Sequence, residues 1–481
     1  MRSCQTITAL SNGVLALWLA LGMLIFEPAP VAAQSIPVES TSTLAATMPV
    51  NEAGTAITLQ QAIQITLEKN PLRKAAVADQ KAASAGVKRA RSMMLPQVAF
   101  SETATRGNDP VYVFGTKLRQ QRFTVADFAL NELNTPAPVS NFSSRFAGEW
   151  SLFDSFASWR NLSRTRFMQQ ASTEQLERTD QELVLRAVQA YYGVLLAQKE
   201  LEVAEQSSAT AQALLQDAKN RYESGLVVES DFLSAQVNAA NRQQELIRAQ
   251  NGVSLAQAEL GTVLGVITQT VFKPVEALTE TPLQTPPLSE LESTALNARP
   301  DLKRIRAEEA AQEQSVSMAK SSFGPKLNAY GSWETDSQNP FSNAANNWVG
   351  GIELKLDLFN GGAKRANLLQ QQAMHEHVTA GKQAYENQVR LEVRRAYYDF
   401  QSASQQVGVA RAATAQAKES LRISQDRYES GLATMTDLLQ IEQAMTQTQT
   451  NYWNAVYQSR TSYATLQLAS GTLNSQSLVT P

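Results

Sequence analysis

The sequence contains an internal duplication, and this feature restricts the possible folds more than any other. The hexapeptide Arg-Tyr-Glu-Ser-Gly-Leu occurs at 221–226 and again, 206 residues later, at 427–432. The same shift relates Ala-Tyr-Tyr at 190–192 to 396–398, Leu-Phe-Asp at 152–154 to Leu-Phe-Asn at 358–360, and Asp231 to Asp437. Four matches in one register indicate two halves with a common plan.

The register changes upstream of these matches. Pro71 and Pro96 correspond to Pro300 and Pro325 with a shift of 229 residues. The first half therefore carries 23 extra residues between Pro96 and Leu152, the difference between shifts of 229 and 206. We expect them in a long loop at about 107–138, because surface loops tolerate insertions.

Each half is expected to contain a helix interrupted near a proline, then two strands, then two long helices. Capping boxes formed by Thr58 with Gln61 and by Ser289 with Glu292 open the two halves. The expected strands cover about 97–105, 145–153, 326–335 and 347–359, and the expected long helices cover about 156–224, 228–265, 362–430 and 434–470.

These elements divide the chain into a first repeat at 57–272 and a second at 290–471. A proline-rich, extended linker is expected between them at 273–289. Residues 34–56 are expected to form a flexible lead-in and 472–481 a C-terminal tail.

The N-terminus has the pattern of an export signal. Arg2 gives a weak positive region, residues 13–26 form an apolar run, and Val31-Ala32-Ala33 offers a cleavage site. The run is shorter than the ~20 apolar residues that span a bilayer, so we predict a signal peptide at 1–33 rather than an anchor. The single cysteine, Cys4, precedes the apolar run, and we expect neither a lipoprotein nor a disulfide.

The segment from Trp348 to Phe359 has small or apolar residues at even positions and Glu353, Lys355 and Asp357 at odd ones. Such alternation is typical of a strand between two unlike environments. Aromatic residues cluster near the expected strands, as in the girdles of membrane barrels, although one face of a soluble sheet would share this pattern. Four strands cannot close a membrane barrel, whose smallest examples have about eight, so several chains would have to share its wall.

Proline is absent from 155–272 and from 341–480. A helix over 156–224 would be roughly 100 Å long, far longer than the ~30 Å hydrocarbon layer. Its apolar stripe is narrow and partly alanine, and its other faces carry Gln, Ser, Thr and Asn. This pattern favours a wall of packed helices around a wet lumen over an ordinary coiled coil. The net charge of −3 gives no sign of a nucleic-acid partner.

Over about 57–471 the chain resembles the TolC-like outer-membrane efflux family. The resemblance lies in the duplicated plan, the paired Arg-Tyr-x-x-Gly-Leu turns, the Asp six residues after each turn glycine and the Leu-Phe-(Asp/Asn) junctions. The resemblance implies a mainly α-helical homotrimer, with a twelve-stranded β-barrel in outer-membrane lipid and a twelve-helix α-barrel in the periplasm. It implies the exit duct of a tripartite efflux pump or type I secretion system, with a periplasmic adaptor (membrane fusion) protein and an inner-membrane pump as partners.

The resemblance also implies site residues. Gly225-Leu226 and Gly431-Leu432 match the tips that meet the adaptor, a role compatible with a helix C-cap. Asp437 matches the first acidic ring of the pore constriction, whereas Gln440 departs from the acidic second ring. An alternative role for Asp437 is that of a first-turn acid which complements the helix dipole.

Asp231 and Tyr428 match two members of the polar latch that holds the family's tip shut. The basic member is replaced by Ala433, so we expect a tip that opens more easily. A conductance left unchanged by Ala433→Arg would argue against this expectation.

The sequence offers little support for an enzyme. It contains neither a phosphate-binding glycine loop nor a nucleophile elbow. His375 and His377, the only histidines, are two apart on an expected helix and point to different sides, so we expect no metal and no cofactor. A periplasmic coiled-coil scaffold or adaptor without a barrel is the main alternative, and a secreted hydrolase is a weaker one. The cargo is not indicated.

Overall fold

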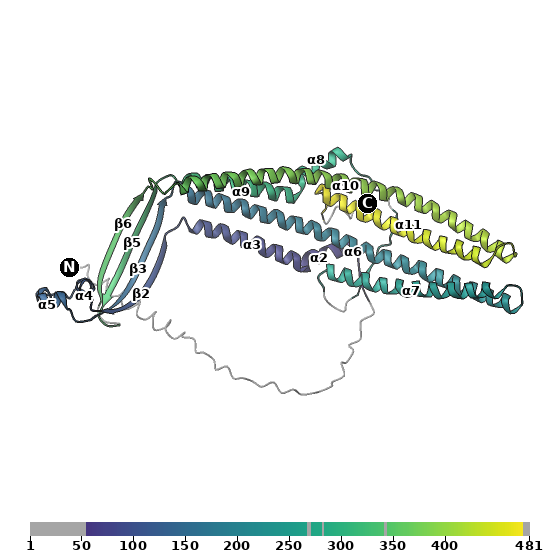
Figure 1. Ribbon diagram of the computed structural model, residues 1–481, viewed down its shortest axis with the longest axis horizontal. Helices are drawn as coiled ribbons and strands as arrows, with labels where there is room; N and C mark the ends of the chain where they lie inside the picture. Colours follow the sequence, from purple (N-terminus) through teal and green to yellow (C-terminus); the bar gives the residue numbers. More distant parts are fainter. Residues whose placement is uncertain (1–53, 267–270, 281–282, 341–343, 475–481) are drawn as a thin grey trace, which may run out of the picture. The chain divides into compact units, whose positions relative to one another are not determined.

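The computed structural model describes residues 54–266, 271–280, 283–340 and 344–474 (Figure 1). The chain divides into two compact units, Met1–Val50 and Asn51–Pro481, and every described residue belongs to the second. The expected signal peptide, most of the lead-in and most of the C-terminal tail therefore lie outside the described residues.

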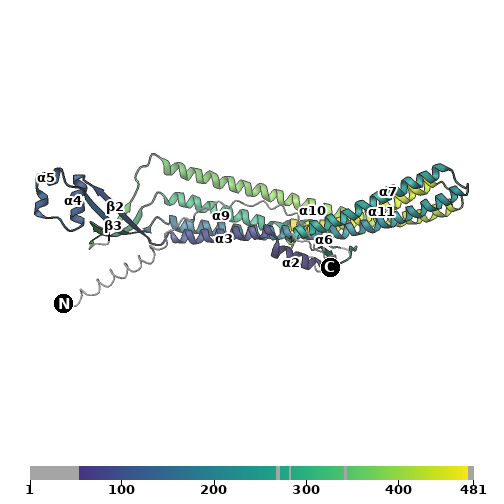
Figure 2. The same cartoon turned by 90° about the horizontal axis from the view of Figure 1, so that it is seen from below.

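Four long helices form two antiparallel hairpins: α6 (Ala157–Glu223) with α7 (Glu229–Val263), and α10 (Ala363–Glu429) with α11 (Met435–Ser470). Each lies within two residues of its expected range. Helix α11 of the second hairpin packs along α6 of the first (Figure 1 and Figure 2). With 67 residues each, α6 and α10 are about 100 Å long.

Within the described part of the chain, no helix combines the length and the apolarity needed to cross a bilayer.

Two pairs of shorter helices precede the sheet strands. They are α2 (Leu59–Lys69) with α3 (Pro71–Ser92), and α8 (Leu288–Ala298) with α9 (Pro300–Ser321). A proline in the first turn starts both α3 and α9, as the missing N–H allows.

The two expected capping boxes have different outcomes. The box of Thr58 with Gln61 is confirmed. The box of Ser289 with Glu292 is wrong, because α8 begins at Leu288 after Pro287, whose fixed φ already suits a helix start. Glu292 instead accepts a hydrogen bond from Arg394 of α10.

The strands β2 (Gln97–Gly107), β3 (Val139–Phe153), β5 (Lys326–Ser337) and β6 (Ala345–Lys355) form one antiparallel sheet in the order β2-β3-β5-β6. Strand β3 begins earlier than the expected residue 145. Strand β6 ends at Lys355, before the expected residue 359, and the chain then turns toward α10 through Gly361 and Gly362, which have φ of +65° and +83°.

Two segments expected to be irregular contain regular structure. The end of the lead-in forms β1 (Thr55–Ile57), which pairs in parallel with β4 (Phe272–Pro274) at the start of the linker. The expected loop at 107–138, called the insertion below, contains α4 (Pro110–Arg119), the 3-10 turn η1 (Val125–Phe128) and α5 (Leu130–Asn134).

The two faces of the sheet differ in chemistry. On one face Phe146 packs between Phe100 and Trp333, with ring centroids 4.8 and 6.0 Å apart. Trp348, the register partner of Trp333, extends this face to β6. The opposite face, called the polar face below, is defined by Asn141, Ser143, Arg145, Ser332, Glu334, Asp336 and Asn347.

Candidate functional site

Both copies of the repeated hexapeptide form the turns between long helices. Gly225 and Gly431 adopt φ of +73° and +75°. The N–H of Leu226 donates to the carbonyl of Arg221, and that of Leu432 to the carbonyl of Arg427, both at 2.8 Å. This is a Schellman-type helix end, which needs a glycine in the left-handed conformation.

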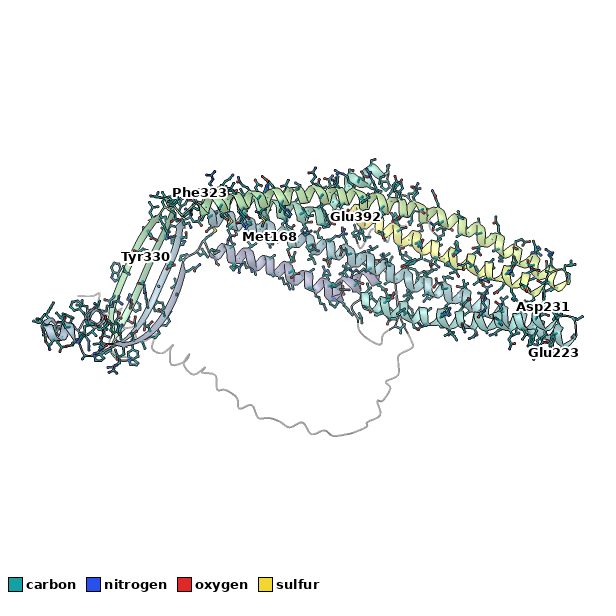
Figure 3. The ribbon with its side chains drawn as sticks, in the orientation of Figure 1. Met168, Glu223, Asp231, Phe323, Tyr330 and Glu392 are labelled. Atoms are coloured by element: carbon teal, nitrogen blue, oxygen red, sulfur yellow. The ribbon has the colours of Figure 1, made fainter. Side chains whose placement is uncertain are left out.

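The turns present an apolar side chain at equivalent positions. Leu226 is 75% exposed and Leu432 is 70% exposed. Glu223 and Asp231 flank the first turn (Figure 3). The expected adaptor-contact residues therefore lie at the ends of both hairpins, in the same backbone geometry.

The two hexapeptides have unlike surroundings despite their identical letters. The guanidinium of Arg221 lies 5.0 Å above the ring of Tyr428, which is buried and joins the first hairpin to the second. The counterparts Tyr222 and Arg427 are both exposed. Tyr222 stacks instead on Phe232 of its own hairpin, with the ring centroids 5.7 Å apart.

The structure places Asp231 and Tyr428 near each other, without a hydrogen bond between them. The hydroxyl of Tyr428 has no hydrogen-bond partner among the described residues. Burial raises the pKa of Tyr428, the charge of Arg221 opposes this rise, and the charges of Asp217 and Asp231 add to it. Ala433, at the position of the absent basic partner, packs against the small core beneath the turns.

Asp437 and Gln440 are exposed and one turn apart at the start of α11. The Asp437 carboxylate accepts hydrogen bonds from Thr434 Oγ1 at 2.7 Å and from the Thr434 N–H at 3.1 Å. These bonds lower the pKa of Asp437, so the carboxylate is ionised at neutral pH. Asp437 is thus a capping-box residue as well as an exposed negative charge.

A buried charged cluster connects the two hairpins, and the sequence reasoning missed it. Glu442 of α11 is 3% exposed, and its carboxylate lies 3.4 Å from the guanidinium of Arg242 on α7. Ser207 of α6 donates to the same carboxylate at 2.8 Å. The sequence does contain a signal for this cluster. One buried face of α11 carries Met435, Leu438 and Glu442 at helical spacing, and an acidic residue in such an apolar stripe indicates a buried charge.

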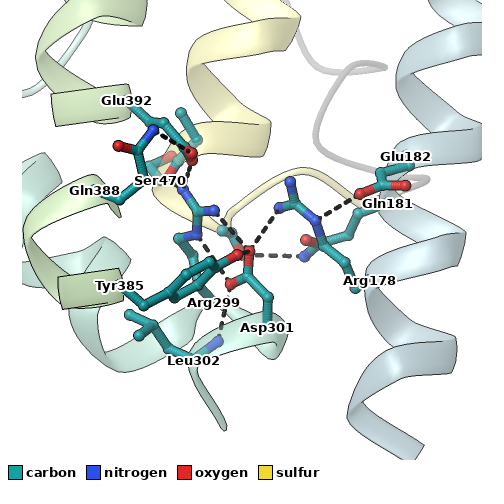
Figure 4. A network of polar contacts seen from close by, with 12 residues as sticks. Arg178, Gln181, Glu182, Arg299, Asp301, Leu302, Tyr385, Gln388, Glu392 and Ser470 are labelled. Atoms are coloured by element: carbon teal, nitrogen blue, oxygen red, sulfur yellow. Dashed lines mark hydrogen bonds and ion pairs between the residues drawn. The ribbon is translucent and has the colours of Figure 1, made fainter. Parts of the chain in front are cut away.

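A second buried network surrounds Arg299, which is 1% exposed (Figure 4). Its guanidinium binds Asp301 in bidentate geometry at 3.0 and 2.6 Å and donates to Glu392 of α10 at 2.8 Å. The Tyr385 hydroxyl donates to the carboxylate of Asp301 at 3.0 Å, and the guanidinium of Arg178 on α6 lies 3.7 Å from the same carboxylate. The network therefore connects the second repeat to the first.

Arg299 has a neutral counterpart in the first half. Asn70 and Arg299 each precede the proline that starts a helix, and each donates from its side chain to a carbonyl near the end of a long helix. The acceptors are Val263 at 2.8 Å and Ala469 at 3.2 Å, 206 residues apart. The correspondence of Pro71 with Pro300 makes these two positions equivalent, but it does not indicate that Arg299 is a buried charge.

Among the described residues, no group of three or more His, Cys, Asp or Glu side chains is placed to hold a metal ion.

Comparison with known proteins gives consistent matches along the chain. The family model described as outer membrane efflux protein matches residues 62–266 and 291–472. The alkaline protease secretion protein AprF of Pseudomonas aeruginosa is 24% identical over 444 residues, which cover 89% of this chain and 87% of AprF. The outer membrane protein TolC of Vibrio cholerae is 26% identical over 341 residues, covering 67% and 75% of the two chains.

The fold also matches solved channels. The CmeC outer membrane channel of Campylobacter jejuni superposes with a TM-score of 0.73 at 18% identity, covering 87% of this chain and 86% of CmeC. The alternation of two strands and two long helices, repeated once, is thus shared with a solved outer-membrane channel.

Proposed function

Because the chain belongs to the outer membrane efflux protein family, we propose that three copies form one outer-membrane exit duct of a tripartite efflux pump or type I secretion system. The sheets would supply a twelve-stranded barrel in the outer membrane, and the long helices a tunnel that projects into the periplasm. Transport through such a duct is passive.

The observation that carries this proposal is that the chain leaves matching surfaces uncovered. The sheet ends in two edge strands, β2 and β6, within the described residues. One of its faces is aromatic and apolar, which suits lipid, but open edges are not tolerated there. Neighbouring copies that pair β6 with β2 would remove the edges.

The helices give the same indication. Helix α11 packs along α6, whereas the corresponding pair, α10 and α7, has no comparable interface among the described residues. Helix α7 exposes an apolar stripe of Leu233, Val237, Ile247 and Leu255. Because α10 is the repeat counterpart of α6 and α7 is the counterpart of α11, α10 of a neighbouring copy is the element that would cover this stripe, as α6 covers α11 within one copy.

The different surroundings of the two identical hexapeptides allow a direct test. If the repeats are quasi-equivalent, Arg427 should lie on Tyr222 of the next copy as Arg221 lies on Tyr428 within one copy. We therefore expect Tyr222→Cys with Arg427→Cys, in a Cys4→Ser background, to form covalent trimers when a bismaleimide joins the two thiols, because the replaced side chains are too long for a direct disulfide. Non-reducing gel electrophoresis of the detergent-extracted outer membrane measures this.

The matched control is Arg221→Cys with Tyr428→Cys, which should cross-link within one chain and leave the monomer mass unchanged. A soluble, monomeric chain with the same helix content would contradict the proposal and favour the periplasmic scaffold. So would a Tyr222→Cys/Arg427→Cys protein that stays monomeric while the control pair cross-links.

The tips are proposed to bind a periplasmic adaptor protein that connects the duct to an inner-membrane pump. The support is the pair of exposed leucines, Leu226 and Leu432, each of which follows a glycine in the left-handed conformation. Leu226→Asp with Leu432→Asp should strongly reduce co-purification of the adaptor, because a charge then faces an apolar contact. Trimer yield should stay unchanged, and undiminished adaptor recovery would count against this role.

Asp437 is proposed to form a single acidic ring at the pore constriction, since it is exposed and ionised near the second tip. Gln440 would leave the next ring neutral. Such a ring favours cations. A reversal potential in a salt gradient that Asp437→Asn does not change would contradict this assignment.

A further inference from the structure

One end of the insertion attaches to three strands of the sheet. The Gln120 side chain donates to Asn141 Oδ1 of β3 at 2.8 Å. Asn347 of β6 donates to the backbone carbonyl of Arg119 at 3.1 Å. The guanidinium of Arg119 lies 3.5 Å from the carboxylate of Glu334 on β5. The C-terminal end of α4 therefore lies across the sheet.

All these strand side chains belong to the polar face. Asp336 lies at the centre of the attachment, is 1% exposed, and accepts hydrogen bonds from Asn141 at 2.7 Å and from Asn347 at 3.0 Å. The aromatic row of Phe100, Phe146 and Trp333 lies on the opposite face. In a membrane barrel the apolar face contacts lipid and the polar face contacts the lumen. The insertion thus lies on the side that would be the lumen.

The insertion is internally ordered. Lys117 and Asp127 form an ion pair at 2.6 Å, and Phe123 packs against both Phe114 and Phe128, with ring centroids 4.7 and 5.2 Å apart. The hydrogen bond from Lys117 lowers the pKa of Asp127 to about 2, so the pair persists into acid. These contacts hold α4, η1 and the loop between them together as one packed unit.

We propose that the insertion is a size-selecting element seated inside the mouth of the duct, where it narrows the exit and excludes bulky solutes while α4 remains on the polar face. This inference rests on the proposed barrel. The proposal gives a function to the 23 extra residues of the first half. The second half has no counterpart of this element, since only a short link joins β5 to β6. Three copies would place three insertions around one exit.

A test must distinguish size selection at the mouth of the barrel from size selection at the helical tips. The reagent is therefore added from outside the cell, where it meets the barrel first. Ser332 lies on the polar face between Asp336 and the helical end of β5. Ser332→Cys, in a Cys4→Ser background, is treated on intact cells with a small membrane-impermeant maleimide or with a bulky polyethylene-glycol maleimide. We expect the small reagent to label Ser332→Cys and the bulky one to be excluded.

Replacing 109–137 by a short Gly-Ser turn should increase labelling by the bulky reagent severalfold. Gln120→Ala with Asn347→Ala should do the same while keeping the insertion. The matched control is Glu102→Ala, which removes a hydrogen bond to Ser144 on the opposite face and should leave the bulky reagent excluded.

The outcomes are distinguishable. Labelling of the parent by the bulky reagent as readily as by the small one would overturn the size-selecting role alone. Continued exclusion of the bulky reagent after the deletion, with the small one still reacting, would overturn it as well. If the small reagent fails to reach Ser332→Cys even in the deletion, the polar face is not a water-filled lumen, and the proposed barrel is overturned with it.

Discussion

Arg299→Leu should lower the free energy of unfolding by about 3–5 kcal/mol, the loss typical when one partner of a buried ion pair is removed. The substitution leaves the carboxylate of Asp301, 5% exposed, with the more distant Arg178, the hydroxyl of Tyr385 and the backbone N–H of Leu302. It also removes the hydrogen bond to the carbonyl of Ala469. Thermal loss of the helical circular-dichroism signal of the purified protein in detergent measures the change.

Asn70→Leu is the matched control, because it changes the corresponding neutral residue of the first half. It removes a helix cap and one hydrogen bond, which together cost about 1–2 kcal/mol. Equal shifts for the two variants would contradict a special role for the buried charge.

The Arg299 network also predicts a pH dependence. Burial raises the pKa of Asp301, but the hydrogen bonds and charge of Arg299 outweigh it, and the net pKa lies below the ordinary 3.8. A lowered acid pKa stabilises the folded state above that value, and the stabilisation is lost as the pH falls below about 4. The stability difference between the parent and Arg299→Leu should therefore narrow in acid.

In the proposed duct, Glu442→Leu should favour open states, because it breaks the buried pair between α7 and α11 and the hydrogen bond from Ser207 that join the two hairpins. Arg242, 7% exposed, would keep only the more exposed Glu245. A closed state destabilised by as little as 1.4 kcal/mol changes the ratio of open to closed channels about tenfold. The open fraction of single channels in planar bilayers provides the measurement.

Glu245→Leu is a suitable control, since it removes the outer partner of Arg242 and leaves the pair between hairpins intact. An open fraction that Glu442→Leu leaves at the parent value would show that the hairpins are not held together by this pair. Substitution of both Arg242 and Glu442 by leucine should restore part of the stability, because no buried charge then remains unpaired.

Local sequence signals predicted most of the architecture. Long stretches without proline and the glycines Gly225 and Gly431 set the ends of the long helices, and strict alternation located β6. The capping box at Ser289 failed because Pro287, two residues earlier, already favours a helix start. Signals of this kind act over one or two turns.

The polar networks could not be predicted in the same way. Ser207 and Glu442 are 235 residues apart, and Arg119 and Asn347 are 228 apart. Nothing in the local pattern around either residue specifies its partner, because the contact arises only when separate hairpins and strands pack. The sequence identified the insertion, but the face on which it folds depends on these distant contacts.

In the proposed trimer, the duplication would give the wall of helices two alternating kinds of contact between hairpins, one within each polypeptide and one between polypeptides. The stacking of Arg221 on Tyr428 belongs to the first kind, and its twin would belong to the second. Each hexapeptide contributes its arginine to one kind of contact and its tyrosine to the other, so a substitution of one of these residues would change only one kind. Each trimer of such a variant would thus keep one kind of contact unaltered, as an internal reference for the weakening of the other kind.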